Sequence, residues 1–293
     1  MLATLQFLGA TASITIATIA IAFAAPVPDG TWPVSQGNVS FSEVYVVKPG
    51  EVFDGKMKTY DRSDIICLEQ TESNVSSAVF DVRPGATLKN VIIGTNQMEG
   101  VHCDMSDCTI ENVWWEDVCE DALSIKGGSN SSVSRVIGGG ARYADDKIVQ
   151  HNGNGTVVID GFFAQDFGKL YRACGTCAPR QRFLNVSNVY ADLQLIRTNR
   201  SAPNVSIVMM NGNYGDEAIL RNIYVKPGAE NYTECASSFG VNKKVWPVVL
   251  SNGPQFPVCQ YTMDEIHLVM DDDDKQQEQQ NVENGAKVGQ TGK

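Results

Sequence analysis

Short aliphatic runs recur between residues 78 and 218 and are separated by turn residues. Six such runs begin at positions 78, 100, 122, 147, 169 and 195, so the units between them are 22 to 26 residues long. Each run has an aliphatic second residue: Val79, Val101, Leu123, Ile148, Leu170 and Ile196. The first three units carry a second short run, marked by Leu88, Ile110 and Val133. Units of this length are too short for a helix pair, so the pattern predicts an all-β solenoid, a parallel β-helix with one coil per unit.

This register decides which polar side chains become neighbours, because residues one unit apart lie about 4.8 Å apart across a parallel sheet. Glu99, Asp121 and Asp146 fall at the same place in successive units, and Glu120 and Asp145 precede the latter two. Stacked carboxylates repel one another when partly desolvated, unless a cation lies among them. Hard carboxylate oxygens without a Cys and His pair favour Ca²⁺ over Zn²⁺. We therefore expect a calcium site, with a solvated acidic edge as the alternative.

Cationic residues gather directly after the acidic positions. Lys147 and Lys169 open neighbouring units, Arg172 follows Lys169 by three residues, and Lys126 ends the run that begins at Ala122. Strict alternation along a strand would place the two lysines on one face and direct Arg172 and Lys126 elsewhere, unless the strand bends. Cations beside a carboxylate cluster predict a site for a polyanion, with calcium bridging acid to acid, whereas scattered surface lysines are the simpler alternative.

Both ends of the chain differ from the repeat. Residues 3 to 25 are apolar and end in Ala22-Phe23-Ala24-Ala25. This fits a signal peptide (1–25) cleaved after Ala24 or Ala25, with an uncleaved membrane anchor as the alternative. Residues 26–270 form the expected β-helix domain. Residues 271–293 lack apolar periodicity and are expected to be a disordered acidic tail, which contributes to the net charge of −11.

Cysteines and glycosylation sequons indicate export through an oxidising route. The chain has 8 cysteines, and Asn-X-Ser/Thr sequons occur at Asn38, Asn74, Asn130, Asn154, Asn185, Asn199, Asn204 and Asn231. Three cysteine pairs are candidates for bridges, namely Cys103 with Cys108, Cys174 with Cys177 and Cys235 with Cys259. Spacing alone leaves other pairings open. A zinc site from the first two pairs is the alternative, but disulfides are the expected use of cysteine in an exported chain.

Four ordered sequence blocks lie between about Phe53 and Asp216. They are Gly94-Thr-Asn-Gln-Met-Glu-Gly-Val-His-Cys103, Cys108-Thr-Ile-Glu-Asn-Val-Trp-Trp-Glu-Asp-Val-Cys-Glu-Asp-Ala122, Ala144-Asp-Asp-Lys147 and Asp166-Phe-Gly-Lys-Leu-Tyr-Arg172. Together they resemble the signature blocks of the polysaccharide lyase family 3 pectate lyases. The resemblance implies a right-handed parallel β-helix, dependence on Ca²⁺, and β-elimination of de-esterified polygalacturonate to 4,5-unsaturated oligogalacturonides.

The resemblance also implies which acids bind calcium. In the family, the acidic residue before Gly-Val-His-Cys and the Glu-Asp pair after the tryptophans are calcium ligands, which carries over to Glu99, Glu120 and Asp121. Glu99 stands where some bacterial members have Asp. Asp146, which corresponds to the acid of the family's Asp-Lys pair, completes the expected metal-binding set.

Roles in catalysis follow from the cations of the same blocks. Elimination removes the proton at C5 of a uronate, and positive charge beside the C6 carboxylate stabilises the charge that develops. Lys147 is the expected base and Arg172 the expected carboxylate clamp, with exchanged roles as the alternative. Lys126, Lys169 and Arg172 are expected to bind substrate. We expect the positive neighbours of Lys147 to lower its pKa, against the opposing effect of Asp146.

Two other functions stay open at this point. Asp145-Asp146 could be the acid pair of a polygalacturonase-type hydrolase, although that enzyme's Gly-His-Gly and Arg-Ile-Lys elements are absent. A noncatalytic β-helix that binds pectin is the second alternative, but a pure binder need not keep a base. The expected protein is a secreted, extracellular monomer that acts on pectin. It is expected to bind no nucleic acid and, after signal cleavage, no membrane.

Histidines and tryptophans in the blocks are expected to be structural. His102 and His151 fall within strand positions, where a packed or turn-bonded histidine is more common than a catalytic one. Only one of Trp114 and Trp115 can face outward from a strand, so the pair is expected to pack rather than to form a sugar platform.

Overall fold

The chain is built almost entirely of short strands. The computed structural model describes residues 24–197, 205–228, 231–243 and 245–270, and the only helical segments among them are three single 3₁₀ turns. The strands are β1 (Asn38–Phe41), β2 (Tyr45–Val47), β3 (Val52–Arg62), β4 (Ala78–Val82), β5 (Thr87–Ile93), β6 (Glu99–Cys103), β7 (Thr109–Trp115), β8 (Asp121–Ile125), β9 (Val133–Ile137), β10 (Gly140–His151), β11 (Gly155–Asp160), β12 (Phe163–Ala173), β13 (Arg182–Asp192), β14 (Val205–Asn211), β15 (Glu217–Lys226), β16 (Tyr232–Phe239), β17 (Val248–Asn252), β18 (Cys259–Gln260) and β19 (Ile266–Leu268). The 3₁₀ turns are η1 (Val75–Ser77), η2 (Gly212–Tyr214) and η3 (Met263–Glu265).

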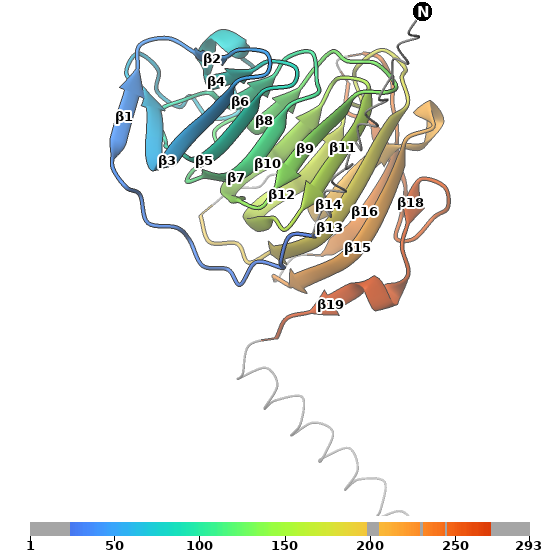
Figure 1. Ribbon diagram of the computed structural model, residues 1–293. Coiled ribbons are helices and arrows are strands. Elements are labelled where there is room, and N and C mark those ends of the chain that lie inside the picture. The colour runs from blue at the N-terminus through green and yellow to red at the C-terminus, as the bar shows by residue number, and fades with distance from the viewer. Residues whose placement is uncertain (1–23, 198–204, 229–230, 244, 271–293) are drawn as a thin grey trace, which may run out of the picture.

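The strands pair in parallel along three ladders that run the length of the stack (Figure 1). The first ladder joins β2, β4, β6, β8, β10, β12, β14 and β16. The second joins the first parts of β3, β5, β7, β13 and β15 with β9 and β11. The third joins the later parts of β3, β5, β7, β13 and β15 with the starts of β10 and β12. The fold is therefore the parallel β-helix that the repeat predicts, and β17 departs from it by pairing antiparallel with β16.

Asparagines turn the chain between the second and third ladders. Asn90, Asn112, Asn188 and Asn222 have φ angles of 51° to 54°, a left-handed conformation that asparagine tolerates better than most residues. Their side chains also link the coils, because Asn112 donates to Asn90 at 2.9 Å and Asn222 donates to Asn188 at 2.7 Å. In the two coils between these pairs, glycines with positive φ occupy the same corner, at positions 138 and 161.

The observed register differs by one residue from that expected at two places. Val101 pairs with Phe80 rather than Val79. Leu123 pairs with Val149 rather than Ile148. Both candidates are fully or almost fully buried in each case, so the hydrophobic pattern alone could not choose between them.

Two further register expectations are wrong. Ile110 pairs with Val136 rather than with Val133. The sixth unit does not begin at Leu195, because β12 pairs with β14 through Lys169 and Ser206. Leu195 lies in irregular chain and is 52% exposed, so an aliphatic residue at the right spacing here marks a loop rather than a coil.

Aromatic residues fill the first coils and cover the middle of the stack. Five rings pack with centroids 4.9 to 5.8 Å apart, those of Phe41, Tyr45, Phe53, Tyr60 and Phe80. Further along, Trp115 is buried in the core, whereas Trp114 packs edge-on against Trp32 at 4.9 Å. The predicted packing role of both tryptophans is confirmed.

Four disulfides hold the stack. The three expected bridges, Cys103–Cys108, Cys174–Cys177 and Cys235–Cys259, are confirmed. A fourth, Cys67–Cys119, was not predicted, and it ties the segment after β3 to the turn before β8. The alternative of a zinc site is wrong, because all of these cysteines are bonded to one another.

The expected leader and tail lie largely outside the part of the chain that the structure describes, which begins at Ala24 and ends at Met270. Within that part, no helix has the length and apolar character needed to cross a membrane.

Shortening a core side chain should destabilise the stack far more than shortening an outward one on the same strand. Ile159 of β11 is fully buried between Val136 and Val186 of the flanking strands. We expect Ile159→Ala to cost about 2–5 kcal/mol of stability. Val158→Ala, next to it but half-buried, should cost much less. Unfolding in guanidinium chloride, followed by tryptophan fluorescence, tests this, and equal losses for the two variants would contradict the inward placement of Ile159.

Candidate active site

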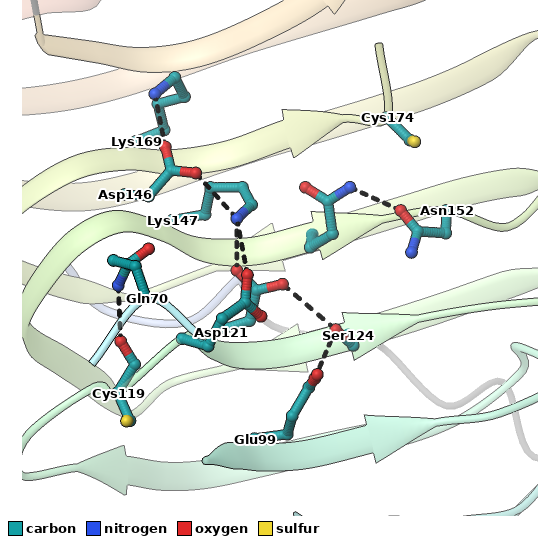
Figure 2. A network of polar contacts seen from close by, with 12 residues as sticks. Gln70, Glu99, Cys119, Asp121, Ser124, Asp146, Lys147, Asn152, Lys169 and Cys174 are labelled. Carbon is teal, nitrogen blue, oxygen red and sulfur yellow. Dashed lines mark hydrogen bonds and ion pairs between the residues drawn. The ribbon is translucent and has the colours of Figure 1, made fainter. Parts of the chain in front are cut away.

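The expected site residues lie where strands of the first ladder begin. Glu99 of β6 pairs with Asp121 of β8, Asp121 pairs with Lys147 of β10, and Lys147 pairs with Lys169 of β12. Two carboxylates and two ammonium groups therefore follow one another across four neighbouring strands (Figure 2). The stacking of the coils brings these residues together although they come from separate units of the sequence.

Asp146 does not occupy the third acidic place that the sequence predicts. The register of β10 shifts between Ala144 and Lys147, so this bulge places Lys147 beside Asp121. Asp146 instead bridges two lysines. Its Oδ2 lies 2.9 Å from Lys147 Nζ, and its Oδ1 lies 2.8 Å from Lys169 Nζ. The expected column of three acids is therefore wrong at its third member.

Lys147 reaches into the acidic group (Figure 2). Its Nζ lies 3.3 Å from Glu120 Oε1 and 3.0 Å from Asp121 Oδ1, in addition to its contact with Asp146. Burial works to lower the pKa of Lys147, but the charges of Asp121, Asp146 and Glu120 outweigh it and raise the pKa. The direct contact of three carboxylates with the ammonium group thus opposes the lowering that the sequence predicts, which includes the effect of a bound Ca²⁺.

The carboxylates of the group differ in the direction of their pKa shifts. Burial raises the pKa of Asp121 well above its usual value, and it raises the pKa of Glu120 as well, with the charge of Lys147 opposing both shifts. Burial also acts to raise the pKa of Glu99, but the hydrogen bond and charge of His102 outweigh it and lower this pKa. Negative charge is thus costly at Asp121 and Glu120 unless a cation is near.

Three carboxylates are arranged so that they could hold a metal ion. Glu99, Glu120 and Asp121 each offer one oxygen, and these atoms lie within 4.8 Å of one another. All three side chains are buried. Asp121 Oδ1 is buried, and its contact is the ion pair with Lys147 Nζ at 3.0 Å. Three buried carboxylates that converge in this way are hard oxygen donors of the kind that Ca²⁺ prefers. Asp146 lies outside this group of three.

Strands of the first ladder bend, so that residues three apart share the outer face. His102 Nε2 lies 2.8 Å from Glu99 Oε2, and Ser124 Oγ lies 3.4 Å from Asp121 Oδ2, each pair coming from a single strand. In the following coils, Gln150 pairs with Ser124 and then with Arg172. Arg172 therefore belongs to the same face as the lysines, which strict alternation would have excluded.

His102 is a neighbour of the acidic group that the sequence did not predict. It is fully buried, as expected of a packed histidine, but it lies between Glu99 and Asp104, with its Nδ1 3.3 Å from Asp104 Oδ1. Ser124 Oγ also donates to Glu99 Oε2 at 3.2 Å. The sequence did carry a sign of these neighbours. His102 follows Glu99 by three residues, and Ser124 follows Asp121 by the same spacing.

His151 fits the predicted structural role. Its Nδ1 lies 2.7 Å from the Tyr171 hydroxyl, and burial lowers the pKa of His151 to about 3. Both residues are fully buried, so the imidazole is a neutral part of the interior.

The two remaining expected site cations lie on either side of Lys147. Lys126 directly follows β8 and is half-buried, and its charge helps to lower the pKa of Glu99 and Asp104. Arg172 is only 7% exposed, and burial lowers its pKa to about 10. Its Nη1 donates to Ser238 Oγ at 3.1 Å and to Asn211 Oδ1 at 3.4 Å.

A cavity of about 450 Å³ opens beside the turn that leads into β8. It is lined in part by the Cys67–Cys119 disulfide, Asp117, Tyr143 and Arg197. Arg197 is paired with Asp117 at 2.5 Å and lies over the ring of Tyr143. Cys119 directly precedes Glu120, so the cavity adjoins the turn that carries the acidic group.

Comparison with known proteins agrees with this geometry. Residues 29–243 match the family model described as pectate lyase. The chain is 47% identical over 232 residues to "Probable pectate lyase D" of Emericella nidulans, which covers 78% of this chain and 82% of the relative. It is 43% identical over 248 residues to "Probable pectate lyase D" of Aspergillus fumigatus, which covers 84% of this chain and 93% of the relative.

Solved structures give the same result. Pectate lyase PelI from Erwinia chrysanthemi, in complex with tetragalacturonic acid, superposes with a TM-score of 0.60 at 27% identity, covering 80% of this chain and 71% of PelI. The catalytic domain of PelI superposes with a TM-score of 0.56 at 30% identity, covering 77% of this chain and 100% of that domain. The match extends over most of the described chain, and the chain therefore belongs to the pectate lyase family and is a polysaccharide lyase.

Proposed function

We propose that this enzyme cleaves de-esterified polygalacturonate by calcium-dependent β-elimination and releases 4,5-unsaturated oligogalacturonides. The observation that carries the proposal is the contact of Lys147 Nζ with Glu120, Asp121 and Asp146, all within 3.3 Å. Elimination at C5 of a uronate needs a base, and it needs positive charge where the C6 carboxylate becomes more negative. Lys147 would supply the base, and a cation bound by the neighbouring acids would supply the positive charge.

The acids that would hold calcium are Glu99, Glu120 and Asp121, with Asp146 as a further candidate ligand. Their burial and mutual approach within 4.8 Å support this assignment for the first three. Ca²⁺ bound there would supply positive charge that stabilises the developing enolate-like anion of the substrate.

Lys147 is the proposed base. A lysine can accept a proton only as the neutral amine, and its contacts with Asp121, Asp146 and Glu120 favour the ammonium form. A cation that neutralised Glu120 and Asp121 would remove two of the three charge interactions that raise the pKa of Lys147. Asp146 is shared with Lys169, so it holds Lys147 less strongly than a carboxylate of its own would.

Arg172 is the proposed clamp for the uronate carboxylate, and Lys169 and Lys126 are proposed to bind neighbouring acidic groups of the polymer. A guanidinium can hold a carboxylate with two parallel hydrogen bonds. The bonds from Nη1 to Ser238 and Asn211 fix the plane of the Arg172 side chain. The alternative is that Arg172 is the base and Lys147 the clamp, which is supported by the lowering of the Arg172 pKa to about 10 by burial.

Hydrolysis by the Asp145-Asp146 pair is less well supported. A glycoside hydrolase needs one carboxyl group that stays protonated to act as the acid. Burial acts to raise the pKa of Asp146, but Lys147 and Lys169 outweigh it and lower the pKa below its usual range. Asp146 is therefore poorly suited to donate a proton.

We also propose that the enzyme acts outside the cell as a monomer after removal of a signal peptide. Several sequon asparagines are exposed and could carry glycans, namely Asn38, Asn74, Asn130, Asn185 and Asn231. Asn154 is half-buried and donates to Gly128 O, whereas Asn199 and Asn204 lie outside the described residues.

The reaction class is tested by incubation with polygalacturonate. We expect the ultraviolet absorbance of the 4,5-unsaturated product to increase with time. The increase should stop when a chelator is added and resume when Ca²⁺ is restored. In Asp121→Asn, the calcium concentration for half activity should rise on the order of tenfold or more, since each 1.4 kcal/mol of lost binding corresponds to tenfold. Asp107→Asn, which lies away from the acidic group, is the matched control. Reducing ends without unsaturation would show hydrolysis instead.

The base is distinguished from the clamp by two variants. Lys147→Ala should lose roughly 10²–10⁴ in turnover, with calcium and polymer binding largely kept. Arg172→Lys should weaken both binding and turnover, because the two-pronged contact with the carboxylate is lost. Binding is measured by calorimetry and turnover by absorbance. If Lys147→Ala keeps most of its turnover, while Arg172→Lys loses it without weaker binding, the two roles must be exchanged.

The bridging role of Asp146 gives a pH dependence. Its pKa is lower in the folded protein than the value of about 3.9 expected when unfolded, so its stabilising effect is fully present above about pH 5 and is lost as the pH falls through the folded pKa. With a chelator present, thermal unfolding should give wild type a higher melting temperature than Asp146→Asn at pH 6. This difference in melting temperature should shrink as the pH falls towards 2. A gap that stays constant across this range would contradict the two ion pairs.

A further inference from the structure

Residues 24–34 form an extended N-terminal strap that lies across the third ladder. The Trp32 ring packs against Trp114, and the Arg142 guanidinium lies 4.2 Å from the centre of the Trp32 ring. Gly30, with a φ of 85°, approaches the ring of Tyr190. Figure 1 shows this segment in dark blue, running from beside β13 towards β1. The strap therefore packs against the third ladder through Gly30 and Trp32.

The strap begins at a carboxylate that is already held in place. The backbone N of Ala25 donates to Asp160 Oδ2 at 2.8 Å. The other oxygen of Asp160 accepts from Ser187 Oγ at 2.9 Å and from Asn188 Nδ2 at 2.7 Å. No ion pair among the described residues includes Asp160. Its negative charge is therefore oriented towards Ala25 without a cation of its own.

Gly161 makes room for the same residue. It occupies the corner position that asparagine holds in four other coils, with a φ of 72°. A side chain at this position would collide with the Ala25 methyl group and come within 3.0 Å of Pro26 O. Asp160 thus binds Ala25 through its carboxylate, and Gly161 leaves the room that Ala25 needs.

The sequence before Ala25 has the form of a cleavage site. Signal peptidases require small residues at the first and third positions before the cut, and these are Ala24 and Ala22 for a cut before Ala25. A cut after Ala25 would place Phe23 at the third position and would remove the residue that contacts Asp160.

We propose that the exported enzyme begins at Ala25 and that its new α-ammonium group forms an ion pair with Asp160. Hydrolysis of the Ala24–Ala25 peptide bond adds the hydroxyl of water to the Ala24 carbonyl carbon and its remaining hydrogen to the Ala25 nitrogen. The new carboxyl group of the leader then loses a proton and the new amine gains one, so the leader leaves as a carboxylate and the donor at Asp160 becomes an ammonium group. A charge-assisted hydrogen bond is stronger than the neutral one it replaces, so processing itself anchors the strap.

The first test is the N-terminal sequence of the secreted protein, obtained by Edman degradation and checked by mass spectrometry of the N-terminal peptide. We expect Ala25-Pro26-Val27. A chain that begins at Pro26, or that keeps residues before Ala25, would overturn the proposal.

The second test measures the ion pair independently of how the chain was processed. Asp160→Asn is compared with wild type in two forms of the enzyme, one that begins at Ala25 and one with Gly-Ser added before Ala25. We expect Asp160→Asn to lower the melting temperature by about 2 °C more in the first form than in the second.

Ser187→Ala is the matched control, because it removes a neutral hydrogen bond to Asp160 and should cost the same in both forms. If Asp160→Asn also costs the same in both forms, the α-ammonium group makes no pair with Asp160 and the proposal fails. Neither test depends on catalytic activity, so its outcome is separate from that of the proposed reaction.

Discussion

Parallel strands of one ladder lie about 4.8 Å apart, and this spacing governs both the stability and the chemistry of the enzyme. Apolar side chains stacked at this distance form one continuous core. Charged side chains stacked at the same distance need an opposite charge or a bound counter-ion beside them, because like charges repel. In the site, Asp121 lies beside Lys147, and Asp146 lies between Lys147 and Lys169. Glu99 and Asp121 are adjacent acids, so this pair is where a further cation would reduce the repulsion.

The same constraint links the metal-binding acids to the proposed base. Asp121 and Glu120 are stabilised as anions by whatever cation is nearest, and in this arrangement that cation is the Lys147 ammonium group. His102 and Ser124 hold Glu99 from the other side. The acidic group is therefore one electrostatic unit with the lysine, so a change at one member alters the protonation of the others.

Much of the architecture was predictable because it rests on local chemistry. Aliphatic residues at repeat spacing predict the coils, and closely spaced cysteines predict the Cys103–Cys108 and Cys174–Cys177 bridges. The position of Asp146 was not predictable, because the bulge before Lys147 shifts the register by one residue and both registers bury apolar side chains. Arg172 reaches the site because the strands bend, and this depends on packing rather than on the order of residues. The Cys67–Cys119 bridge joins positions that only the completed stack brings together.

The Cys67–Cys119 bridge makes the acidic group sensitive to redox conditions. It fixes Cys119, whose carbonyl also accepts a hydrogen bond from Gln70 at 2.7 Å (Figure 2). The next residue is Glu120 of the acidic group. Thiol reductants would release this turn and leave Glu120 without its covalent support, whereas an oxidising compartment keeps it in place. An oxidising environment therefore supports the geometry of the turn that carries Glu120.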